Sequence, residues 1–449
     1  MKRRELMSLG GAGAAAALAP GALAAAKGSK KTQLAPTPPM GWNSWNSFAT
    51  TINEAQAIEQ ATIMARELKP AGYDVFTVDI QWYEPTASSY TYSDKPQPAM
   101  DGYGRLQPAE NRFPSSQGGR GFKPLAGQIH AMGLRFGVHL MRGIPRLAVE
   151  RNLPVLGTTL KARDIADTAS ICNWNPDMFG VDMSKPGAQA YYDSVFALLA
   201  SWGVDFVKVD DLSRPYDAHA PEIEAIAKAI KRSGRPMILS MSPGETPVVR
   251  GAHARAHAQM WRISDDFWDE WGMLAAQFGR LENWNLFMGD GGWPDADMLP
   301  LGKLALGERD TRFTPAEQRT LMTLWSIARS PLIMGGDLRH LDAATKALLT
   351  NPEVIAVNQA STANGPLCVI DYQRIWTARA PGGDHYLALF NTADEAKEVG
   401  VDLKWLGVRG SVAVRDLWRR QPDGSATGKI ARKLDAHGAG LYRLSSAAG

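Results

Sequence analysis

Cysteine is scarce in this sequence, and neither sign of charge is in excess. Only Cys172 and Cys368 occur among 449 residues, and neither has the spacing of a metal-binding motif, so we expect two free thiols rather than one long-range disulfide. The formal net charge is +3 without a basic run, which gives no indication of a nucleic-acid partner. The histidines lack zinc-ligand spacing, and we expect no metal site.

A long apolar run is also absent after the N-terminus. The first residues carry the pair Arg3-Arg4, then a stretch rich in Ala, Gly and Leu that ends at Ala24–Ala26. This pattern predicts a cleavable twin-arginine export signal rather than a membrane anchor. Because no later stretch reaches about 18 apolar residues, we expect a soluble mature protein in the periplasm or the medium, with no membrane partner. Residues 1–30 are assigned to this signal and its linker, and the oligomeric state is left open.

The rest of the chain alternates between short apolar runs and helical patterns. Strands are expected at 73–82, 134–141, 204–210, 237–241, 260–263 and 331–334, and helices at 54–68, 125–132, 186–202, 221–233 and 317–328. Such alternation predicts a parallel sheet with right-handed crossovers. We expect a (β/α)8 TIM barrel over residues 31–350, with a doubly wound open sheet as the alternative. Residues 83–122 have no periodicity and predict a long loop over the strand ends.

The pattern changes near residue 351. Short strand-like runs at 369–378, 385–391, 397–403, 411–416 and 440–444 are separated by Gly, Asp and Asn. They predict a C-terminal antiparallel β-sandwich domain over residues 351–449.

Two of the predicted strands end in carboxylates. The run Val204–Val209 ends at Asp210 and Asp211, and a second run ends at Asp265 and Asp266. Since the C-terminal rim of a parallel barrel carries the chemistry, these strand ends predict a carboxylate pair. Such a pair can serve as the nucleophile and the general acid/base of glycoside hydrolysis.

Each carboxylate has rivals and a structural alternative. Asp210 shares a strand face with Lys208, whereas Asp211 points elsewhere, but Asp210 could also simply pair with that lysine. Asp266 competes with Asp265 and Asp269 within an acidic run, and could be a surface acid. A lysine beside the nucleophile would keep the nucleophile ionised.

Other candidate residues follow the early strands. Asp79 ends the second predicted strand and could accept hydrogen bonds from sugar hydroxyls, with Trp82 or Trp45 as a stacking surface. His139 ends another strand. The stretch 291–298 predicts a loop, whose spacing does not match a calcium-binding EF-hand.

These residues resemble glycoside hydrolase family 27, the α-galactosidase family, over about residues 38–444. The opening motif is matched by Pro38-Pro39-Met40-Gly41-Trp42-Asn43-Ser44-Trp45, the nucleophile motif by Lys208-Val209-Asp210, and the Trp-x-Asp-x-Asp-Met-Leu loop by residues 293–299. The family's acid/base lies four residues after an arginine, here Arg262, and this selects Asp266.

The resemblance implies a barrel followed by an antiparallel β domain, and a retaining mechanism without a cofactor. It also implies sugar contacts by Trp45, Asp79 and Asp297, with Lys208 and Arg262 beside the carboxylates. In a retaining enzyme, the two catalytic carboxyl groups lie about 5–5.5 Å apart.

Several positions depart from the family pattern. The paired aspartates after the second strand are Asp79-Ile80 here, so one sugar-binding carboxylate is replaced by isoleucine. A family cysteine near the nucleophile is Leu212, and a frequent tyrosine is His139. These changes resemble a bacterial branch in which a change at the second aspartate is associated with β-L-arabinopyranosides. That sugar is galactose-shaped but lacks the C6 hydroxymethyl group, so an apolar side chain could tolerate it.

We therefore expect an exported retaining exo-glycosidase that releases terminal α-D-galactose, with β-L-arabinopyranosidase activity as the close alternative. Asp210 and Asp266 are the expected catalytic residues. Trp45, Asp79, Ile80, His139, Lys208, Arg262 and Asp297 are the expected substrate-binding residues. A non-catalytic carbohydrate-binding protein is the alternative from a different class, although it would not need both carboxylates.

Overall fold

The structure is a computed structural model that describes residues 33–446. From Leu34 onward these residues form one compact unit. The predicted export signal at residues 1–30 lies outside the described residues. None of the helices in the described part of the chain is both long and apolar enough to cross a bilayer.

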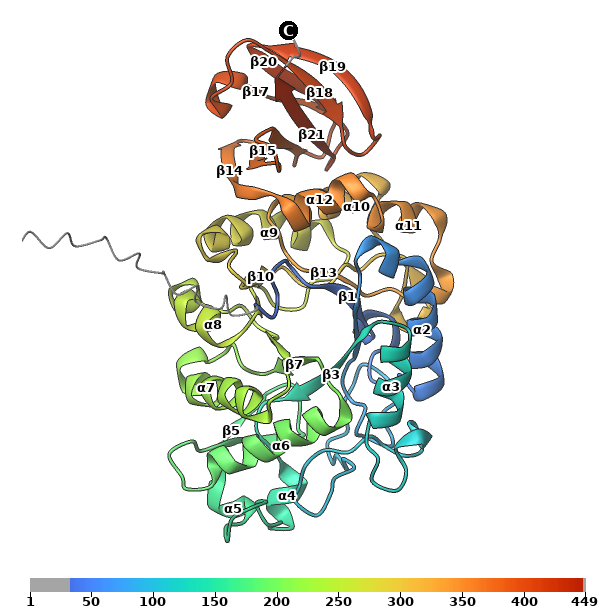
Figure 1. Ribbon diagram of the computed structural model, residues 1–449, viewed down its shortest axis with the longest axis vertical. Helices are drawn as coiled ribbons and strands as arrows, with labels where there is room; N and C mark the ends of the chain where they lie inside the picture. The colour runs from blue at the N-terminus through green and yellow to red at the C-terminus, as the bar shows by residue number, and fades with distance from the viewer. Residues whose placement is uncertain (1–32, 447–449) are drawn as a thin grey trace, which may run out of the picture. The chain divides into compact units, whose positions relative to one another are not determined.

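Eight parallel strands form the predicted barrel, in the order β10-β9-β8-β7-β3-β2-β1-β13 (Figure 1). They are β1 (Met40–Asn43), β2 (Val75–Val78), β3 (Arg135–Met141), β7 (Phe206–Asp210), β8 (Ile238–Met241), β9 (Met260–Arg262), β10 (Trp293–Asp295) and β13 (Leu332–Met334). A parallel bridge from Leu299, beyond β10, to Met334 of β13 joins the two ends of this sheet. The (β/α)8 fold class is confirmed.

Helices connect these strands, and two further helices, α11 and α12, follow β13. They are α1 (Trp45–Phe48), α2 (Glu54–Glu67), α3 (Lys123–Ala131), α6 (Ala188–Trp202), α7 (Tyr216–Ser233), α8 (Gly251–His257), α9 (Trp271–Trp284), α10 (Pro315–Ile327), α11 (Ala343–Leu349) and α12 (Pro352–Ala360). The five predicted helices correspond to α2, α3, α6, α7 and α10 and begin within about five residues of the predicted positions, because their apolar residues recur with helical spacing. The other five were not predicted.

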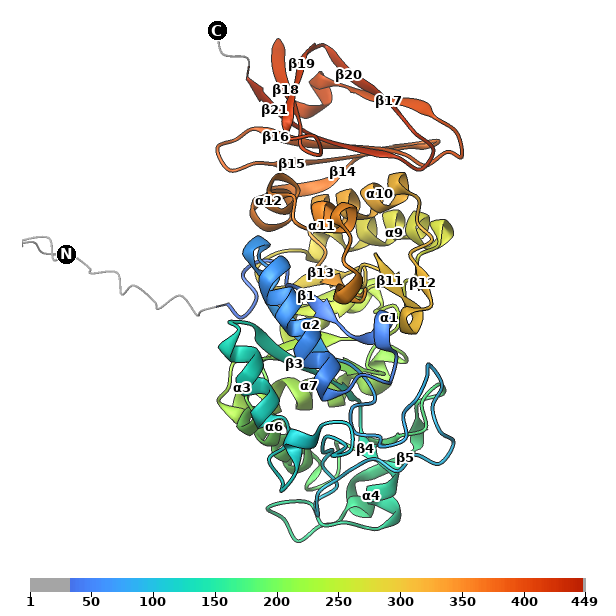
Figure 2. The ribbon, with the colours of Figure 1, turned by 90° about the vertical axis from the view of Figure 1, so that its right-hand side faces the viewer.

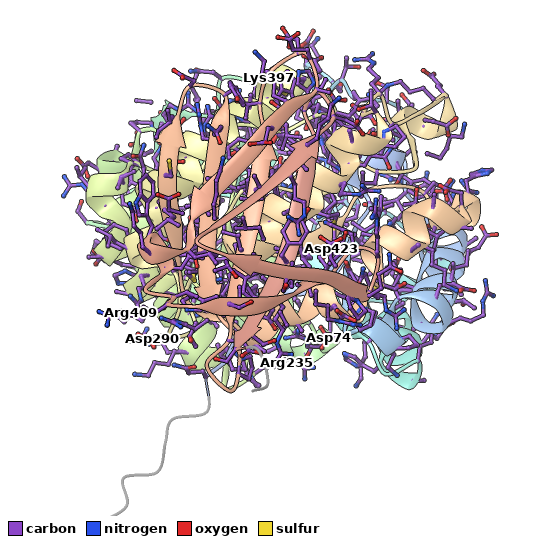
Figure 3. All side chains as sticks on the ribbon, turned by 90° about the horizontal axis from the view of Figure 1, so that it is seen from above. Asp74, Arg235, Asp290, Lys397, Arg409 and Asp423 are labelled. Carbon is purple, nitrogen blue, oxygen red and sulfur yellow. The ribbon has the colours of Figure 1, made fainter. Side chains whose placement is uncertain are left out.

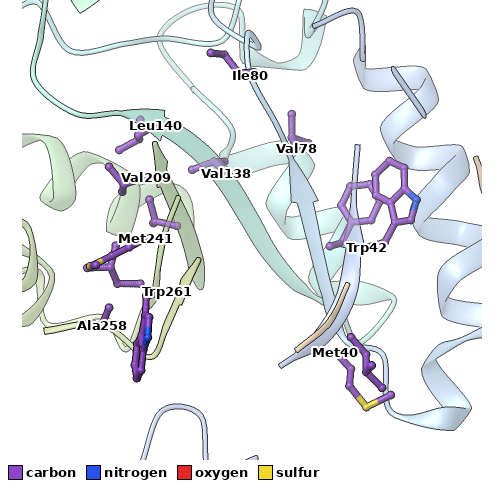
Figure 4. Packing of buried hydrophobic residues seen from close by; sticks show 14 of the residues in the cluster. Met40, Trp42, Val78, Ile80, Val138, Leu140, Val209, Met241, Ala258 and Trp261 are labelled. Carbon is purple, nitrogen blue, oxygen red and sulfur yellow. The ribbon is translucent and has the colours of Figure 1, made fainter. Parts of the chain in front are cut away.

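Side-chain alternation along the strands decides which residues reach the interior of the barrel. Val207 and Val209 of β7 belong to the main apolar cluster, which also contains residues of the surrounding helices. Figure 4 shows Val209 together with Val78 of β2 and Val138 of β3 in that cluster. Phe206 belongs to a separate cluster with one apolar residue from each of several other strands. Lys208 and Asp210 share the face of Phe206, so they extend into the mouth of the barrel.

Two segments differ from the expectation. Residues 293–295 were predicted as part of a loop but form β10, which pairs in parallel with β9. Its three residues include a proline and follow two glycines, so no strand pattern is visible. An unpredicted small sheet of β4 (Ile144–Pro145), β6 (Met178–Val181) and β5 (Ala166–Ile171) follows β3, together with α4 (Arg146–Glu150) and α5 (Ala162–Ile165). The long loop at 83–122 is confirmed, apart from a single 3-10 turn at Pro114–Ser116.

An eight-stranded antiparallel sheet forms the C-terminal domain. Its strands are β14 (Thr362–Ile370), β15 (Gln373–Arg379), β16 (His385–Asn391), β17 (Lys397–Asp402), β18 (Ser411–Asp416), β19 (Gln421–Thr427), β20 (Lys429–Leu434) and β21 (Ala439–Ser446). This domain has its own apolar core, which includes Leu387, Val401 and Leu444. A short hairpin of β11 (Lys303–Leu304) and β12 (Arg309–Asp310) lies within the barrel segment. Cys172 and Cys368 are free thiols, as expected.

The C-terminal sheet packs against the barrel helices (Figure 2). The Phe390 ring lies 5.0 Å from that of Phe278 on α9. His437 stacks on Trp271 at 3.7 Å. Asn351, which caps α12, donates to the carbonyl oxygen of Leu417. The two ring contacts brace α9, the helix that follows the second carboxylate strand, and the contact of Asn351 braces α12.

Charged side chains of both signs are spread over the protein, as the balanced composition predicts. Figure 3 labels acidic residues such as Asp290 and Asp423 and basic residues such as Lys397 and Arg409 at separate places in the view from above.

The interface with the C-terminal sheet should contribute substantially to stability. Phe390 is fully buried, so Phe390→Ala leaves a cavity and should lower the free energy of unfolding by about 3–5 kcal/mol. Ile370→Ala is the matched control, because this side chain is 49% exposed and its loss should change stability by at most about 0.5 kcal/mol. Urea unfolding measures both changes. Equal effects of the two substitutions would show that the sheet does not brace the barrel.

Candidate active site

Asp210 ends β7 and lies inside the mouth of the barrel, with 5% of the residue exposed. The Nε2 atom of His139 on β3 lies 2.9 Å from its Oδ2 atom. The Lys208 Nζ atom lies 3.8 Å from Oδ1. Oδ1 is buried and accepts no hydrogen bond from any residue in the described part of the chain. The carboxylate is therefore held on one side and has a free oxygen on the other.

The environment of Asp210 favours its ionised form. Burial alone would raise the pKa of this carboxyl group, but Lys208, His139 and Arg262 together outweigh that effect and hold the pKa at about 2. A carboxylate that is ionised at neutral pH, yet shielded from water, has the state that a nucleophile needs.

Asp79 follows β2 and is fully buried. Its Oδ2 atom accepts from Asn43 Nδ2 at 2.7 Å and lies 3.0 Å from Lys208 Nζ. The backbone amide of Ile80 donates to Oδ1 of the same carboxylate at 2.9 Å. Lys208 therefore joins the two carboxylates at the ends of β2 and β7. Ile80 is 2% exposed and lies directly beside Asp79.

Asp266 follows β9 and has a side chain that is 48% exposed. Its Oδ1 atom lies 3.3 Å from Arg262 Nη2, and the other terminal nitrogen, Nη1, lies 2.7 Å from Asp297 Oδ1. Asp297 also accepts from the backbone amide of Phe267 at 2.7 Å. The buried Arg262 therefore orients the loop that carries Asp266, while Asp266 itself faces solvent.

Asp297 is held in an unusual backbone conformation with φ of 84°. Burial raises its pKa, Arg262 lowers it, and the charges of Asp266 and Asp295 raise it again, to about 7. The backbone amide of Asp297 donates to Asp295 Oδ1 at 2.9 Å, which helps to hold this conformation.

Asp211 is also in the left-handed region, with φ of 64°. Arg142, which follows β3, donates from Nε to the backbone oxygen of Asp211 and from Nη2 to its Oδ2 atom at 2.8 Å. Nη1 of the same guanidinium donates to the buried Glu222 at 2.6 Å. The amide of Arg142 donates to the carbonyl oxygen of Asp210. Arg142 thus holds the turn immediately after Asp210.

The rival acids have structural partners instead. Asp265 pairs with Arg214, and both side chains are exposed. Asp269 is buried and accepts from both Arg309 terminal nitrogens. Neither has the contacts with Arg262 that Asp266 has.

The two candidate tryptophans have different surroundings. Trp82 is fully buried and packs edge-on against Phe122 and Trp202, so its expected role as a sugar-stacking surface is wrong. Trp45, at the start of α1, is half-buried and contacts the ring of Tyr90.

Sequence reasoning missed several residues at this site. Asn43 lies within the quoted opening motif but gave no separate signal of its contact with Asp79. Arg142 is one arginine among many, and its position directly after a strand was its only signal. Tyr90 and Tyr92 lie in the long loop, where no periodicity indicates direction.

A small cavity of about 20 Å³ lies beneath these residues and is lined by Lys208, Arg262, Asp295 and Asp297. A much larger cavity of about 880 Å³ lies between α10, α11 and the C-terminal sheet, away from the carboxylates. Within residues 33–446, no group of three or more His, Cys, Asp or Glu side chains is arranged to hold a metal ion.

Comparison with protein families gives two matches. The model described as alpha galactosidase A matches residues 177–360, and that of the alpha galactosidase C-terminal beta sandwich domain matches residues 371–444. The first covers Asp210, Asp266 and Asp297.

Individual relatives agree with this assignment. An α-galactosidase of Cyamopsis tetragonoloba is 28% identical, covering 92% of this chain and 87% of the relative. A family 27 β-L-arabinopyranosidase structure from Geobacillus stearothermophilus is 49% identical, with a TM-score of 0.91, covering 93% of this chain and 98% of the other. A variant of that protein was solved in complex with arabinose.

A structure described as a putative α-N-acetylgalactosaminidase from Bacillus halodurans is 45% identical, with a TM-score of 0.83, covering 91% of this chain and 97% of the other. The family models, the similarity over nearly the whole chain and the paired carboxylates at the strand ends agree: the chain belongs to glycoside hydrolase family 27 and is a glycosidase.

Proposed function

We propose that the protein is a retaining exo-glycosidase that releases terminal β-L-arabinopyranose, with terminal α-D-galactose as the second candidate. The two sugars have the same ring stereochemistry and differ at C5, where galactose carries a hydroxymethyl group. This reverses the order of preference expected from the sequence.

The observation that carries this proposal is Ile80 beside Asp79. Its side chain is apolar and buried, and its backbone amide is already committed to the Asp79 carboxylate. A buried sugar hydroxyl that faces an apolar side chain loses a partner at a cost of about 1–3 kcal/mol. A sugar without the C6 hydroxymethyl group has no hydroxyl at this position and therefore avoids this cost. The 49% identity to a β-L-arabinopyranosidase supports the same choice.

α-D-Galactose stays the second candidate, because the α-galactosidase relatives match nearly the whole chain. The proposed partners of the ring hydroxyls that both sugars share are Asp79 and Lys208, which pair at 3.0 Å.

In the proposed mechanism, Oδ1 of Asp210 attacks the anomeric carbon and the glycosidic bond breaks, giving a covalent glycosyl-enzyme. Asp266 donates its proton to the departing oxygen. In the second step, Asp266 takes a proton from water, which attacks the anomeric carbon and frees Asp210. Two displacements return the sugar with its original configuration. Sugar contacts by Trp45, His139 and Asp297 complete the proposal.

Replacing Ile80 by an acidic residue should change which sugar the enzyme prefers. In Ile80→Asp, the new carboxylate can accept from the galactose C6 hydroxyl, so the ratio of kcat/KM for galactoside over arabinopyranoside should rise by about tenfold or more. Paired p-nitrophenyl glycosides measure the ratio, and Ile80→Val is the control that keeps the wall apolar. An unchanged ratio in Ile80→Asp would reject Ile80 as the specificity determinant.

Replacing each carboxylate should separate their roles. Asp210→Gly should lower turnover by at least about a thousandfold, and added azide should restore it by forming a glycosyl azide of inverted configuration. Asp266→Ala should mainly slow substrates with poor leaving groups, and azide should give a product of retained configuration. Asp265→Ala, the exposed neighbour, is the control and should stay near wild type. The same azide product from both catalytic variants would contradict the assignment.

The cation beside Asp210 should set the acid limit of activity. Asp210 must be ionised to attack, so activity is lost as the pH falls through its pKa, which is held at about 2. Lys208→Met removes the largest charge that opposes burial, so the pKa should rise and the acid limb of kcat/KM should move to higher pH. Lys404→Met, at a 74% exposed side chain, is the control. If the acid limb of the kcat/KM profile does not move in Lys208→Met, Lys208 does not control the ionisation of Asp210.

A further inference from the structure

Aromatic side chains form a cluster that includes Trp268, two residues after Asp266. Tyr90 of the long loop lies 5.4 Å from Trp45 and 6.0 Å from Trp268, measured between ring centroids. The Tyr90 hydroxyl donates to the carbonyl oxygen of Asn46 at 2.9 Å, which fixes the loop on α1. Trp268 follows Asp266 by two residues and is half-buried. This fixed ring pair therefore lies next to the candidate acid.

A second aromatic pair comes from the unpredicted segment after β5. Trp174 is 42% exposed, and its ring lies 5.9 Å from that of Tyr92. The adjacent Asn175 donates to Asp177, which also accepts from Gln81, the residue after Ile80. The backbone that carries Trp174 is thereby tied to the sugar-binding side.

Tyr92 connects this second pair to the carboxylates. It packs against the main apolar cluster but is only partly buried. Burial raises the pKa of its hydroxyl well above the usual range, and the charges of Asp210, Asp79 and Asp266 add to that rise. The Tyr92 hydroxyl is thus close enough to these carboxylates for their charges to act on it, and the Tyr92 ring contacts that of Trp174.

An exposed tryptophan beside an active site is unusual as a packing residue. Trp174 and the nearby Ile171, which is 47% exposed, leave apolar surface in contact with water. Asn173, between them in sequence, is exposed as well. An indole face bordered by an amide suits the apolar C–H face and the hydroxyls of a sugar ring.

We propose that Trp268 and Trp174 form two walls of a leaving-group subsite that takes a pyranose ring. This inference rests on the proposed function, because the leaving oxygen must reach Asp266. Since Asp266 is half-exposed while Asp210 is buried, whatever the departing oxygen carries extends outward past Trp268. The natural substrate is then a saccharide in which the terminal sugar is linked to another pyranose.

The test compares two donors that share the terminal sugar. β-L-Arabinopyranosyl fluoride has no leaving-group ring, whereas a disaccharide of β-L-arabinopyranose linked to galactopyranose has one. Trp268→Ala and Trp174→Ala should each lower kcat/KM for the disaccharide by about tenfold, the scale of one lost stacking contact. Both variants should stay within about twofold of wild type on the fluoride. Trp405→Ala is the control, because this tryptophan is 50% exposed in the C-terminal domain and should change neither value.

Three outcomes would overturn the inference. Equal losses of kcat/KM on both donors would show that the tryptophans have a structural role. Unchanged kcat/KM for the disaccharide would show that neither tryptophan contacts the leaving-group ring. A Trp174→Ala variant that changes the mass in solution and slows both donors equally would make that ring part of a subunit contact. If the proposed function itself were wrong, the wild-type enzyme would not hydrolyse β-L-arabinopyranosyl fluoride. This result differs from all three outcomes, in which wild type does hydrolyse it.

Discussion

Buried carboxylates in the mouth of the barrel depend on two shared cations. Lys208 lies between Asp79 and Asp210, and Arg262 lies between Asp266 and Asp297. A charge moved out of water costs several kcal/mol unless it is paired. Lys208 therefore offsets the burial of Asp79 and Asp210, and Arg262 offsets that of Asp297 while also contacting the half-exposed Asp266. Because Lys208 is two residues before Asp210 and Arg262 four before Asp266, the strands that deliver the acids also deliver their counterions. The fold and the charge balance of the site therefore cannot be separated.

Two strained backbone positions lie in the same place. Asp211 and Asp297 both have positive φ, which costs a non-glycine residue roughly 1–3 kcal/mol. Each is held by an arginine, Arg142 in one case and Arg262 in the other. Both arginines are fully buried, with their donors directed at these turns. Asp211 lies one residue after the proposed nucleophile Asp210. Asp297 accepts from the backbone amide of Phe267, in the loop that carries Asp266. Guanidinium groups, which present a rigid fork of donors, are suited to fixing such turns.

Strand alternation explains how much of this could be predicted from the sequence. Lys208 and Asp210 were correctly placed on one face, because side-chain period is a local property of the chain. The β10 strand was missed because its three residues, one of which is proline, are too few to show the alternating apolar pattern of a strand. The contacts of Arg142 and Tyr90 were missed because they join segments far apart in sequence. Trp82 was one of two alternatives for the sugar-stacking surface, the other being Trp45, and its burial against Trp202 rules it out. Local patterns indicate which face a residue occupies, but not which distant residue covers it.

The two sides of the site are built differently, and this bears on what each can recognise. The groups proposed to contact the terminal sugar lie on or directly after barrel strands, where pairing with neighbouring strands fixes their positions. The aromatic groups proposed to surround the leaving oxygen lie on the long loop, on the segment after β5 and, for Trp268, on the loop that follows β9, and none of these segments belongs to the barrel sheet. Loops tolerate insertions and substitutions better than paired strands do. A family can therefore keep one hydrolytic reaction while its members differ in the sugar chains they accept, and in this chain Ile80 and Trp174 lie on opposite sides of that division.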